Sequence, residues 1–269
     1  MNQHLKRWIT GLVLTPLIFA FIFYSSENIF SFFVLVVIQL AVWELNTLLF
    51  PKPGYALEKG AVFIFAFIIP FSLVLDSLAS LASVLTFCLF AAFLIFLWQI
   101  REAEIDISRL GKVIIGFMYL PVLLSYFILL RQLPKGVAWV FLTLFIAFFG
   151  DFFAFYVGRI IGKRKLQPLV SPGKTVEGAL GMIVGSLLGS LLFRRFFFPM
   201  LPLGHAAMLG ICGGILGQLG DLFESAIKRS SGVKDAGFLF PGHGGIMDRL
   251  DSISFIAPFV FYYQHFVIR

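Results

Sequence analysis

Charged side chains are scarce in this chain of 269 residues, where Asp, Glu, Lys and Arg together make up 13% of the total. A soluble domain usually carries about 25% charged residues, so too few are present to cover the surface of a globule in water. Apolar residues account for 59%, Phe alone occurs 35 times, and the mean hydropathy is +0.97. The composition therefore excludes an ordinary soluble domain and predicts a polytopic membrane protein.

Cysteine and histidine are also scarce, which limits the chemistry that the chain can use. Both cysteines, Cys88 and Cys212, lie in apolar stretches, so neither a disulfide scaffold nor a zinc site is expected. His4, His205 and His265 lie near the termini or the span ends, where no partners are expected. The net charge of +7 is typical of basic cytoplasmic loops in a membrane protein, and no nucleic-acid partner is expected.

Apolar runs long enough to span a membrane, which takes about 20 residues, recur along the whole chain. Nine candidates are present, at 8–24, 29–49, 61–76, 78–98, 112–130, 136–157, 176–193, 205–223 and 253–268. A cleavable signal peptide is the alternative for the first run, but no small-residue cleavage site follows it, which favours an uncleaved helix. The predicted fold is an all-α polytopic membrane protein with about nine transmembrane helices.

The distribution of Lys and Arg predicts the orientation of these spans. If the N-terminus is cytoplasmic, the inner segments hold 16 of the 21 basic residues. The outer segments hold the other five, which are Arg131, Lys135, Arg194, Arg195 and Arg269. We therefore expect a bacterial-type inner or plasma membrane protein with its N-terminus in the cytoplasm and its C-terminus outside.

The two halves of the chain differ in character. Residues 1–110 are Phe-, Leu- and Ile-rich with few polar interruptions, which predicts an N-terminal transmembrane scaffold. Residues 111–269 are predicted to form a C-terminal catalytic region, because Gly, Asp, Lys and Pro gather in the inner loops 158–175 and 224–252. Both loops lie on the predicted cytoplasmic side, where any active site is expected.

Glycines line one face of each of the spans 176–193 and 205–223. They are Gly178, Gly181, Gly185 and Gly189 in the first span and Gly210, Gly213, Gly214, Gly217 and Gly220 in the second. Small residues let helices approach closely in lipid, so we interpret both faces as packing surfaces. If the two helices pack together, Glu177 comes near Asp221.

Acidic residues gather at the end of the eighth span and in the loop that follows. Asp221, Glu224 and Lys228 share a helix face, although a solvated helix end is an alternative interpretation for Asp221. Further on, three glycines surround His243, and the backbone of this glycine-rich segment can wrap an anion. Asp248 and Asp251 follow with Arg249 between them. Carboxylate oxygens and substrate phosphates are typical ligands of Mg²⁺, so this pattern indicates metal-assisted phosphate chemistry.

The loop 158–175 is basic and rich in hydroxyls, and it leads into a predicted helix start. Ser171, Lys174 and Thr175 suit a phosphate, with Arg159 and Lys165 as further candidates. The run Ser-Pro-Gly-Lys-Thr is not a P-loop, because the first glycine and the preceding strand are missing. A basic segment that only contacts lipid head groups is the alternative interpretation.

These motifs resemble a known family, the phosphatidate cytidylyltransferases or CDP-diacylglycerol synthases. The signature comprises Ser225, Lys228-Arg229, Lys234-Asp235, Gly237, Phe240-Pro241, His243-Gly244-Gly245 and Asp248-Arg249-Leu250-Asp251. Upstream, residues 151–178 are similar too, with departures at Phe155 and Gly173, where Tyr and Lys or Asn are common. The likeness is expected to cover about the last 120 residues, the first half being similar only in hydropathy.

The resemblance implies that CTP and phosphatidate react to give CDP-diacylglycerol and pyrophosphate, with Mg²⁺ as cofactor and a second cation left open. Membrane lipids are further partners, and the likeness alone implies a homodimer. The residues expected to be catalytic are Asp221, Asp248, Lys174, Arg249 and Asp251. The expected metal ligands are Asp221 and Asp248, supported by Glu224 and Asp251. The expected substrate-binding residues are Ser171, Thr175, Arg159, Lys165, Lys228, Arg229, Lys234, His243, Gly244 and Gly245.

Two alternatives come from other classes of protein. A transporter or channel with an inner charged gate should place ionisable groups near the bilayer midplane, whereas the acidic groups here are expected at span ends. A CTP-dependent polyprenol or lipid kinase would release CDP rather than pyrophosphate. A CDP-alcohol phosphotransferase is disfavoured, because its Asp-x-x-Asp-Gly-x-x-Ala-Arg run is absent from the sequence.

Overall fold

The computed structural model describes residues 1–269 except 1–15, 53, 76–77, 101–104, 238–243 and 269. The chain divides into two compact units. The first unit comprises Met1–Leu129 and Asp235–Asp248, and the second comprises Leu130–Lys234 and Arg249–Arg269. The chain therefore leaves the second unit after Lys234 and returns to it at Arg249, through the short 3-10 helix η2 (Met247–Arg249).

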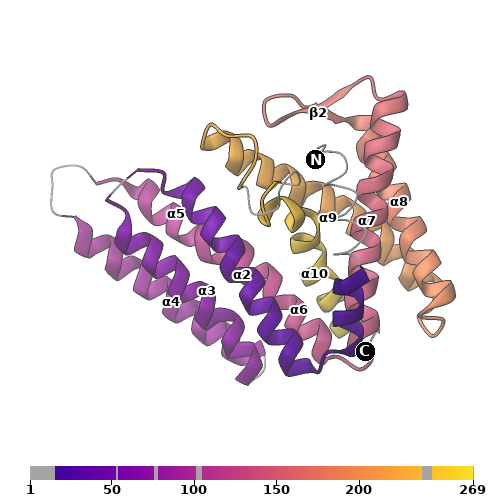
Figure 1. The fold of residues 1–269 in the computed structure, drawn as a ribbon, viewed down its shortest axis with the longest axis horizontal. Coiled ribbons are helices and arrows are strands. Elements are labelled where there is room, and N and C mark those ends of the chain that lie inside the picture. The colour runs from indigo at the N-terminus through magenta and orange to yellow at the C-terminus, as the bar shows by residue number, and fades with distance from the viewer. Residues whose placement is uncertain (1–15, 53, 76–77, 101–104, 238–243, 269) are drawn as a thin grey trace. The chain divides into compact units, whose positions relative to one another are not determined.

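The first unit is built from long apolar helices that pack side by side (Figure 1). They are α2 (Glu27–Leu49), α3 (Ala56–Leu75), α4 (Leu78–Gln99), α5 (Ile107–Phe117) and the π-helical η1 (Met118–Val122). The side chain of Ser26 caps α2 by accepting a hydrogen bond from the amide of Ile29. Pro121 lies in η1 and has no amide hydrogen to donate, which fits the local departure from α-helical geometry.

The second unit contains α7 (Gly136–Ile161), α8 (Val176–Phe196), α9 (Leu203–Ser230), α10 (Asp251–Tyr263) and the π-helical η3 (Gln264–Ile268). Helix α6 (Leu123–Gln132) runs across the boundary between the units. Within this unit α7 packs on α8, α8 on α9, and α9 on α10. The acidic residues of α9 and α10 are thus carried by neighbouring helices.

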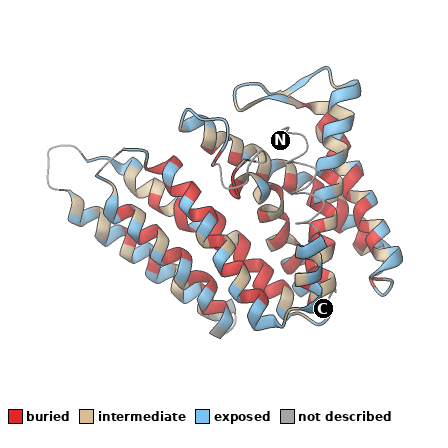
Figure 2. Cartoon of the chain, in the orientation of Figure 1, coloured by how far each residue is buried: buried red, intermediate tan, exposed pale blue. Residues whose placement is uncertain are grey.

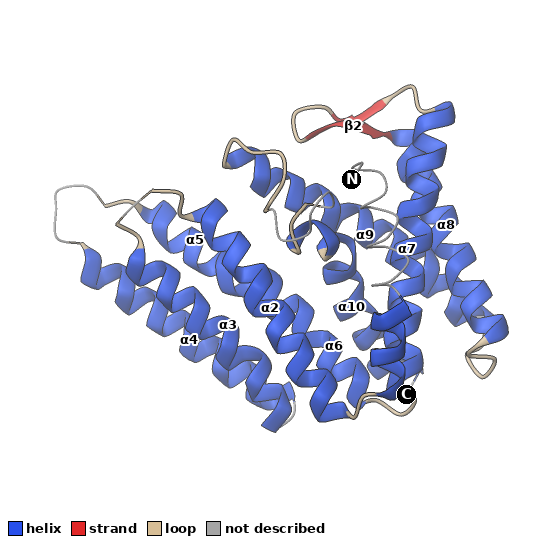
Figure 3. Ribbon diagram, viewed as in Figure 1, coloured by secondary structure: helices blue, strands red, loops and turns tan. Residues whose placement is uncertain are grey.

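A two-stranded antiparallel hairpin occupies most of the segment that the sequence predicts as loop 158–175 (Figure 3). Strand β1 (Lys165–Gln167) pairs with β2 (Ser171–Thr175), and α7 continues to Ile161. The segment between the two spans therefore contains regular structure that the sequence analysis does not predict. The reason is that β2 contains Pro172 and Gly173, which argue against a strand in any sequence analysis.

Seven helices are long and apolar enough to cross a membrane within the described residues. They cover Glu27–Leu49, Ala56–Val74, Ser80–Gln99, Ile107–Gln132, Gly136–Ile161, Val176–Phe196 and Leu203–Ser230. The first predicted span lies partly outside the described residues, and the ninth corresponds to α10 and η3. The all-α, polytopic membrane fold is confirmed, whereas the count of nine and the sides of the termini remain predictions.

The glycine faces pack helices, as the sequence analysis interprets them, and α8 and α9 do pack together. A side chain at Gly185 of α8 would collide with Phe149 and Phe153 of α7, so this face lies against α7. Glycines of α9 lie against α8, where Gly210 meets Leu187 and Gly214 meets Ile183. Spacing identifies a small-residue face but not its partner, since both neighbours of α8 can use it.

Helix α4 carries little of the buried core, as its mostly exposed surface in Figure 2 shows. Among its described residues only Leu81, Cys88 and Ala92 are buried. Their spacing of seven and four places them on one narrow face, which packs on α3. The apolar remainder suits a lipid environment. Cys88 and Cys212 are both free cysteines, as expected.

Candidate active site

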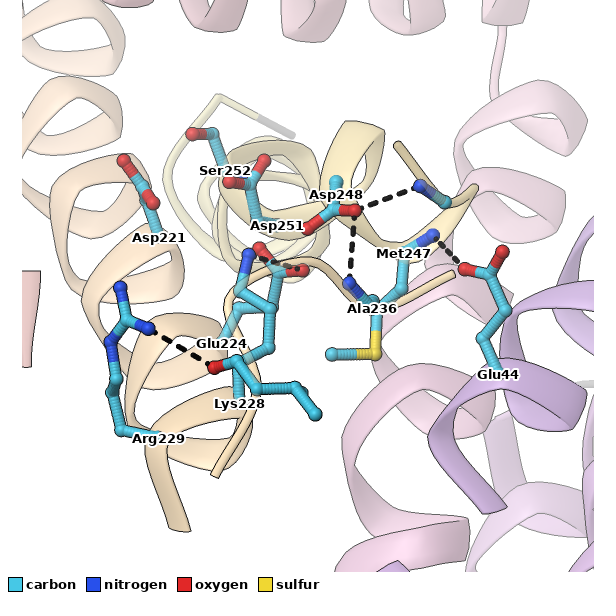
Figure 4. A network of polar contacts seen from close by, with 12 residues as sticks. Glu44, Asp221, Glu224, Lys228, Arg229, Ala236, Met247, Asp248, Asp251 and Ser252 are labelled. Atoms are coloured by element: carbon cyan, nitrogen blue, oxygen red, sulfur yellow. Dashed lines mark hydrogen bonds and ion pairs between the residues drawn. The ribbon is translucent and has the colours of Figure 1, made fainter. Parts of the chain in front are cut away.

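Three carboxylates of the second unit lie together where α9 and α10 meet (Figure 4). Asp221 and Glu224 come from one face of α9, and Asp251 is the first residue of α10. One oxygen from each residue lies within 4.8 Å of the others. The glycines of α9 permit this approach, because a side chain at Gly220 would collide with the backbone of Asp251. We call these three residues the carboxylate cluster.

Two lysines neutralise part of the carboxylate cluster. The Nζ atom of Lys174, on β2, lies 2.5 Å from Oδ2 of Asp221, and Nζ of Lys228 lies 3.2 Å from Oε1 of Glu224. Both side chains of the second pair are largely buried, with Glu224 fully so. Lys174 thus connects the hairpin to the acidic end of α9, which brings together two motifs that lie 47 positions apart in the sequence.

Glu177, at the start of α8, binds the residues that lead into the hairpin. Its carboxylate accepts hydrogen bonds from the amides of Lys163 and Arg164 at 3.0 and 3.2 Å. It also pairs with the guanidinium of Arg164 at 3.2 Å. Glu177 therefore fixes the entry to the hairpin at the start of α8, and Lys174 is the residue that reaches Asp221.

A fourth acidic residue, Asp151 of α7, adds to the negative charge at this place. Its Oδ1 atom accepts a hydrogen bond from the hydroxyl of the buried Ser252 at 3.1 Å. Asp151 lies inside α7 rather than at its end, so the expectation that acidic groups lie only at span ends is wrong. Burial, together with the nearby charges of Asp221 and Glu224, raises the pKa of Asp251 well above its usual value.

Counted as ionised, the acidic groups in this region outnumber the basic ones. Four acidic groups face the two paired lysines and Arg249, which lies close enough to Asp151 to act on its charge. Partly buried carboxylates that repel one another favour a cation between them, and hard oxygen ligands suit a divalent ion such as Mg²⁺. The donor set therefore fits the metal that the sequence analysis expects.

One hydroxyl of the hairpin already has a structural role. Thr175 is the N-cap of α8, where its Oγ1 atom accepts a hydrogen bond from the amide of Gly178 at 3.1 Å. Ser171 begins β2, and Lys165 is exposed on β1. Arg159 lies 6.0 Å from the ring centroid of Phe155. Phosphate binding by these residues remains a prediction.

Arg229 holds the hairpin to the end of α9. Its Nε atom donates to the carbonyl of Val170 at 3.2 Å, and its Nη1 atom donates to the carbonyl of Val233 at 3.1 Å. Val170 belongs to the turn between the two strands. Arg229 thus fixes the hairpin that carries Lys174, whereas Lys234 is exposed to solvent.

The predicted ligand Asp248 belongs to the first unit, together with Gly244 and Gly245. Its Oδ2 atom accepts hydrogen bonds from the amides of Gly245 at 2.8 Å and Ala236 at 3.2 Å (Figure 4). Gly244 has a φ angle of +80°, a conformation that favours glycine. His243 lies outside the described residues, and Arg249 is exposed in η2. A metal site shared by Asp221 and Asp248 remains a prediction.

Sequence reasoning did not select Glu44, which contacts the same segment. Glu44 is fully buried in α2, and its Oε2 atom accepts a hydrogen bond from the amide of Met247 at 2.9 Å. The sequence does contain a signal for Glu44, because an acidic residue inside an apolar run of a membrane protein usually belongs to a functional site. The same signal applies to Asp151.

Comparison with known proteins places these residues in a family. Residues 5–267 match the Cytidylyltransferase family. The chain is 32% identical over 263 residues to the phosphatidate cytidylyltransferase of Bacillus subtilis (strain 168), a likeness that covers 96% of each chain. It is 42% identical over 119 residues to the phosphatidate cytidylyltransferase of Haemophilus influenzae, which covers 43% of this chain and 41% of the relative.

The likeness extends further than the motifs indicate. It includes the N-terminal half, so the expectation that only the last 120 residues resemble the family is wrong. Lipid-facing helices tolerate many apolar exchanges, and a relationship between them is hard to see in one sequence. From its motifs and from the length of this match, the chain belongs to the cytidylyltransferase family.

Proposed function

We propose that this protein transfers the cytidylyl group of CTP to phosphatidate, giving CDP-diacylglycerol and pyrophosphate. The observation that carries the proposal is the carboxylate cluster with Lys174 beside it, at the end of a membrane-spanning helix. Acidic residues that hold a cation and a lysine that binds phosphate are the groups that two polyanionic substrates need. The family and the name of the Bacillus subtilis relative support the same reaction.

The protein does not need to generate a nucleophile for this reaction. A phosphate oxygen of the lipid is already anionic near neutral pH, and its attack on the α-phosphate of CTP expels pyrophosphate. The difficulty is to bring two anions together and to align the attacking and leaving oxygens. Lys174 and Lys228 carry fixed positive charge at this place, and Arg229 holds the hairpin so that Lys174 stays in position.

The carboxylate cluster is the proposed binding site for Mg²⁺. Asp221, Glu224 and Asp251 would hold the ion, and the assignment of Asp248 as a further ligand is part of the proposal. When bound, a divalent cation neutralises phosphate charge and aligns the displacement. The protein's own contribution is to keep these oxygens fixed and partly shielded from water, which strengthens their interaction with the ion.

One assay tests the proposed reaction. Purified protein in detergent is supplied with labelled CTP and phosphatidate, with and without Mg²⁺, and both products are followed. We expect CDP-diacylglycerol and pyrophosphate in equal amounts, and only with the metal present. Release of CDP together with a phosphorylated lipid would instead identify a lipid kinase, and the absence of any CTP turnover would favour a transporter.

The proposed active site faces the cytoplasm, where CTP is found. The distribution of basic residues along the sequence predicts that the hairpin lies inside and the C-terminus outside. Reporter fusions at residue 168 and at the C-terminus should therefore report opposite sides of the membrane. Fusions that report the same side would show that the number of spans between them is wrong.

A homodimer is a further part of the proposal. It rests on the likeness to the family, and each chain contains its own carboxylate cluster. Light scattering of the protein–detergent complex should give a protein mass of about twice the 30.2 kDa of one chain. A mass equal to one chain would contradict it.

A further inference from the structure

Glu44 lies far along the sequence from the residues that the sequence analysis selects, yet it contacts the segment that contains Asp248. The side chain comes from α2 and is 1% exposed. Its partner, the amide of Met247, is 203 positions further along the chain. Burying a carboxylate is costly unless polar partners compensate for the loss of water. The hydrogen bond from the Met247 amide therefore compensates part of the cost of burying Glu44 and ties α2 to a distant segment.

Two glycines of the same segment make room for the Glu44 carboxylate. A side chain at Gly237 would collide with Oε1 of Glu44, and one at Gly245 would collide with Oε2. Neither glycine has a positive φ angle, so the close approach, rather than backbone conformation, accounts for the absence of a side chain. The two described ends of the segment 235–248 thus both lie against one carboxyl group.

The residues beside these contacts hold Asp248. The amide of Ala236 precedes Gly237, the amide of Gly245 belongs to the second glycine, and both donate to Oδ2 of Asp248. Glu44 accepts from Met247, the residue immediately before Asp248. The backbone that Glu44 fixes is therefore the backbone that orients the Asp248 carboxylate, and Figure 4 shows these contacts.

We propose that Glu44 is a positioning residue for the reaction. It anchors residues 235–237 and 244–248, the described ends of this segment, on α2 and so holds the Asp248 carboxylate in the orientation needed to support metal binding. This inference rests on the proposed function and on the assignment of Asp248 within it. It gives the N-terminal half of the chain a defined part in the chemistry, although Glu44 itself acts only through the segment that it holds.

Hydrogen–deuterium exchange tests the anchor without any use of activity. In the metal-free full-length protein, Glu44→Ala should raise the exchange rate of the amides at 244–248 at least tenfold. Glu44→Gln keeps a carbonyl oxygen for the Met247 amide and should exchange nearly as the wild type does. The matched control is Glu58→Ala, which removes an equally buried acid from α3 of the same unit and should leave 244–248 unchanged.

Metal activation tests the positioning role. Glu44→Ala should raise the Mg²⁺ concentration for half-maximal CDP-diacylglycerol formation about tenfold, with activity partly restored at high Mg²⁺. Glu58→Ala should keep the wild-type Mg²⁺ midpoint. A loss of folded protein alone lowers the maximal rate and leaves this midpoint in place, so the two effects are separable.

A pair of substitutions tests whether the glycine contact is the one described. Gly237→Ala alone should impair metal activation, because the added methyl group meets the Glu44 carboxylate. In a Glu44→Ala background the same change should have little further effect, since the obstacle is gone, so the two effects should not add.

The inference is overturned if Glu44→Ala leaves the exchange at 244–248 unchanged, or if it frees the segment without moving the Mg²⁺ midpoint. Full additivity of the glycine and glutamate substitutions would also contradict it. A wild-type protein that forms no CDP-diacylglycerol would overturn the proposed function instead, while the exchange experiment still decides whether Glu44 holds the segment.

Discussion

Acidic side chains occur in two different settings in this molecule. In the second unit, Asp221, Glu224 and Asp251 face one another and are matched only in part by lysines. In the first unit, Asp248 and Glu44 each accept hydrogen bonds from backbone amides. The first arrangement gathers negative charge that a cation can bind, whereas the second fixes the path of the chain and, with it, the direction of the Asp248 carboxylate.

The comparison shows that burial alone does not reveal the role of an acidic residue in a membrane protein. Excess charge among neighbouring carboxylates favours a metal ligand, because their repulsion falls when a cation binds. Hydrogen bonds from amides fix the direction of a carboxylate while its charge remains, so Glu44 can hold the chain and Asp248 can still face a cation. The four predictions that follow either test this distinction or test the packing on which it depends.

The largest expected effect follows removal of one charge from the carboxylate cluster. Asp221→Asn keeps the shape of the side chain but removes a metal ligand, so activity should fall about 100-fold or more, as losses of electrostatic stabilisation in active sites do. The measurement is the rate of CDP-diacylglycerol formation over a range of Mg²⁺. Asp106→Asn is the control, because it changes an exposed acid that caps α5, and Asn caps equally well. Near-normal activity of Asp221→Asn would contradict the proposed metal site.

The next effect concerns the cation opposite Asp221. Lys174→Met keeps the length of the side chain and removes its charge, and turnover should fall about 10- to 100-fold as phosphate stabilisation is lost. Thermal unfolding should show a folded protein. Lys163→Met, an exposed lysine before the same hairpin, should retain activity. If Lys174→Met is fully active, the hairpin is only a basic segment at the lipid surface.

A third prediction tests the packing that supports the second unit. Gly185→Ala places a methyl group against α7, at Phe149 and Phe153, and should destabilise the protein by about 1–3 kcal/mol, as overpacking does. The midpoint of thermal unfolding in detergent measures this effect. A side chain at Gly60 of α3 meets nothing within 4 Å, so Gly60→Ala should not destabilise the protein. Equal midpoints for both variants would contradict the packing of α8 on α7.

The smallest expected effect separates a helix cap from a substrate ligand. Thr175→Ala removes the cap of α8 and should destabilise the protein by about 1 kcal/mol. Thr175→Ser keeps the hydroxyl and should restore stability. A change in the KM for CTP beyond the loss of folded protein would show that Thr175 also binds substrate, and an unchanged stability would contradict the cap.

Local spacing made part of the site predictable. Asp221, Glu224 and Lys228 are three and four residues apart, so helical periodicity alone places them on one face. The proximity of Asp251 and Lys174 to that face depends on tertiary packing, and only their residue types and the family motif pointed to them. Hydropathy predicted seven of the long helices, because lipid imposes a strong requirement on composition.

Other features leave no local signature. The contact between Glu44 and Met247 joins positions 203 residues apart, and no spacing rule connects them. The α8 glycines lie against α7 rather than α9, because a small-residue face is compatible with either neighbour. The hairpin escapes prediction since its second strand contains proline and glycine, and its stability comes from contacts such as those of Arg229 and Glu177.

The path of the chain through its two units also sets an order of assembly during synthesis. Helix α2, which contains Glu44, emerges early from the ribosome. The amide of Met247, which donates a hydrogen bond to Glu44, appears only when nearly the whole protein has been made. The first unit therefore cannot be completed before residue 248 has been translated. A chain that stops short of this point lacks the last part of its first unit, and the Glu44 carboxylate is then buried without the amide of Met247.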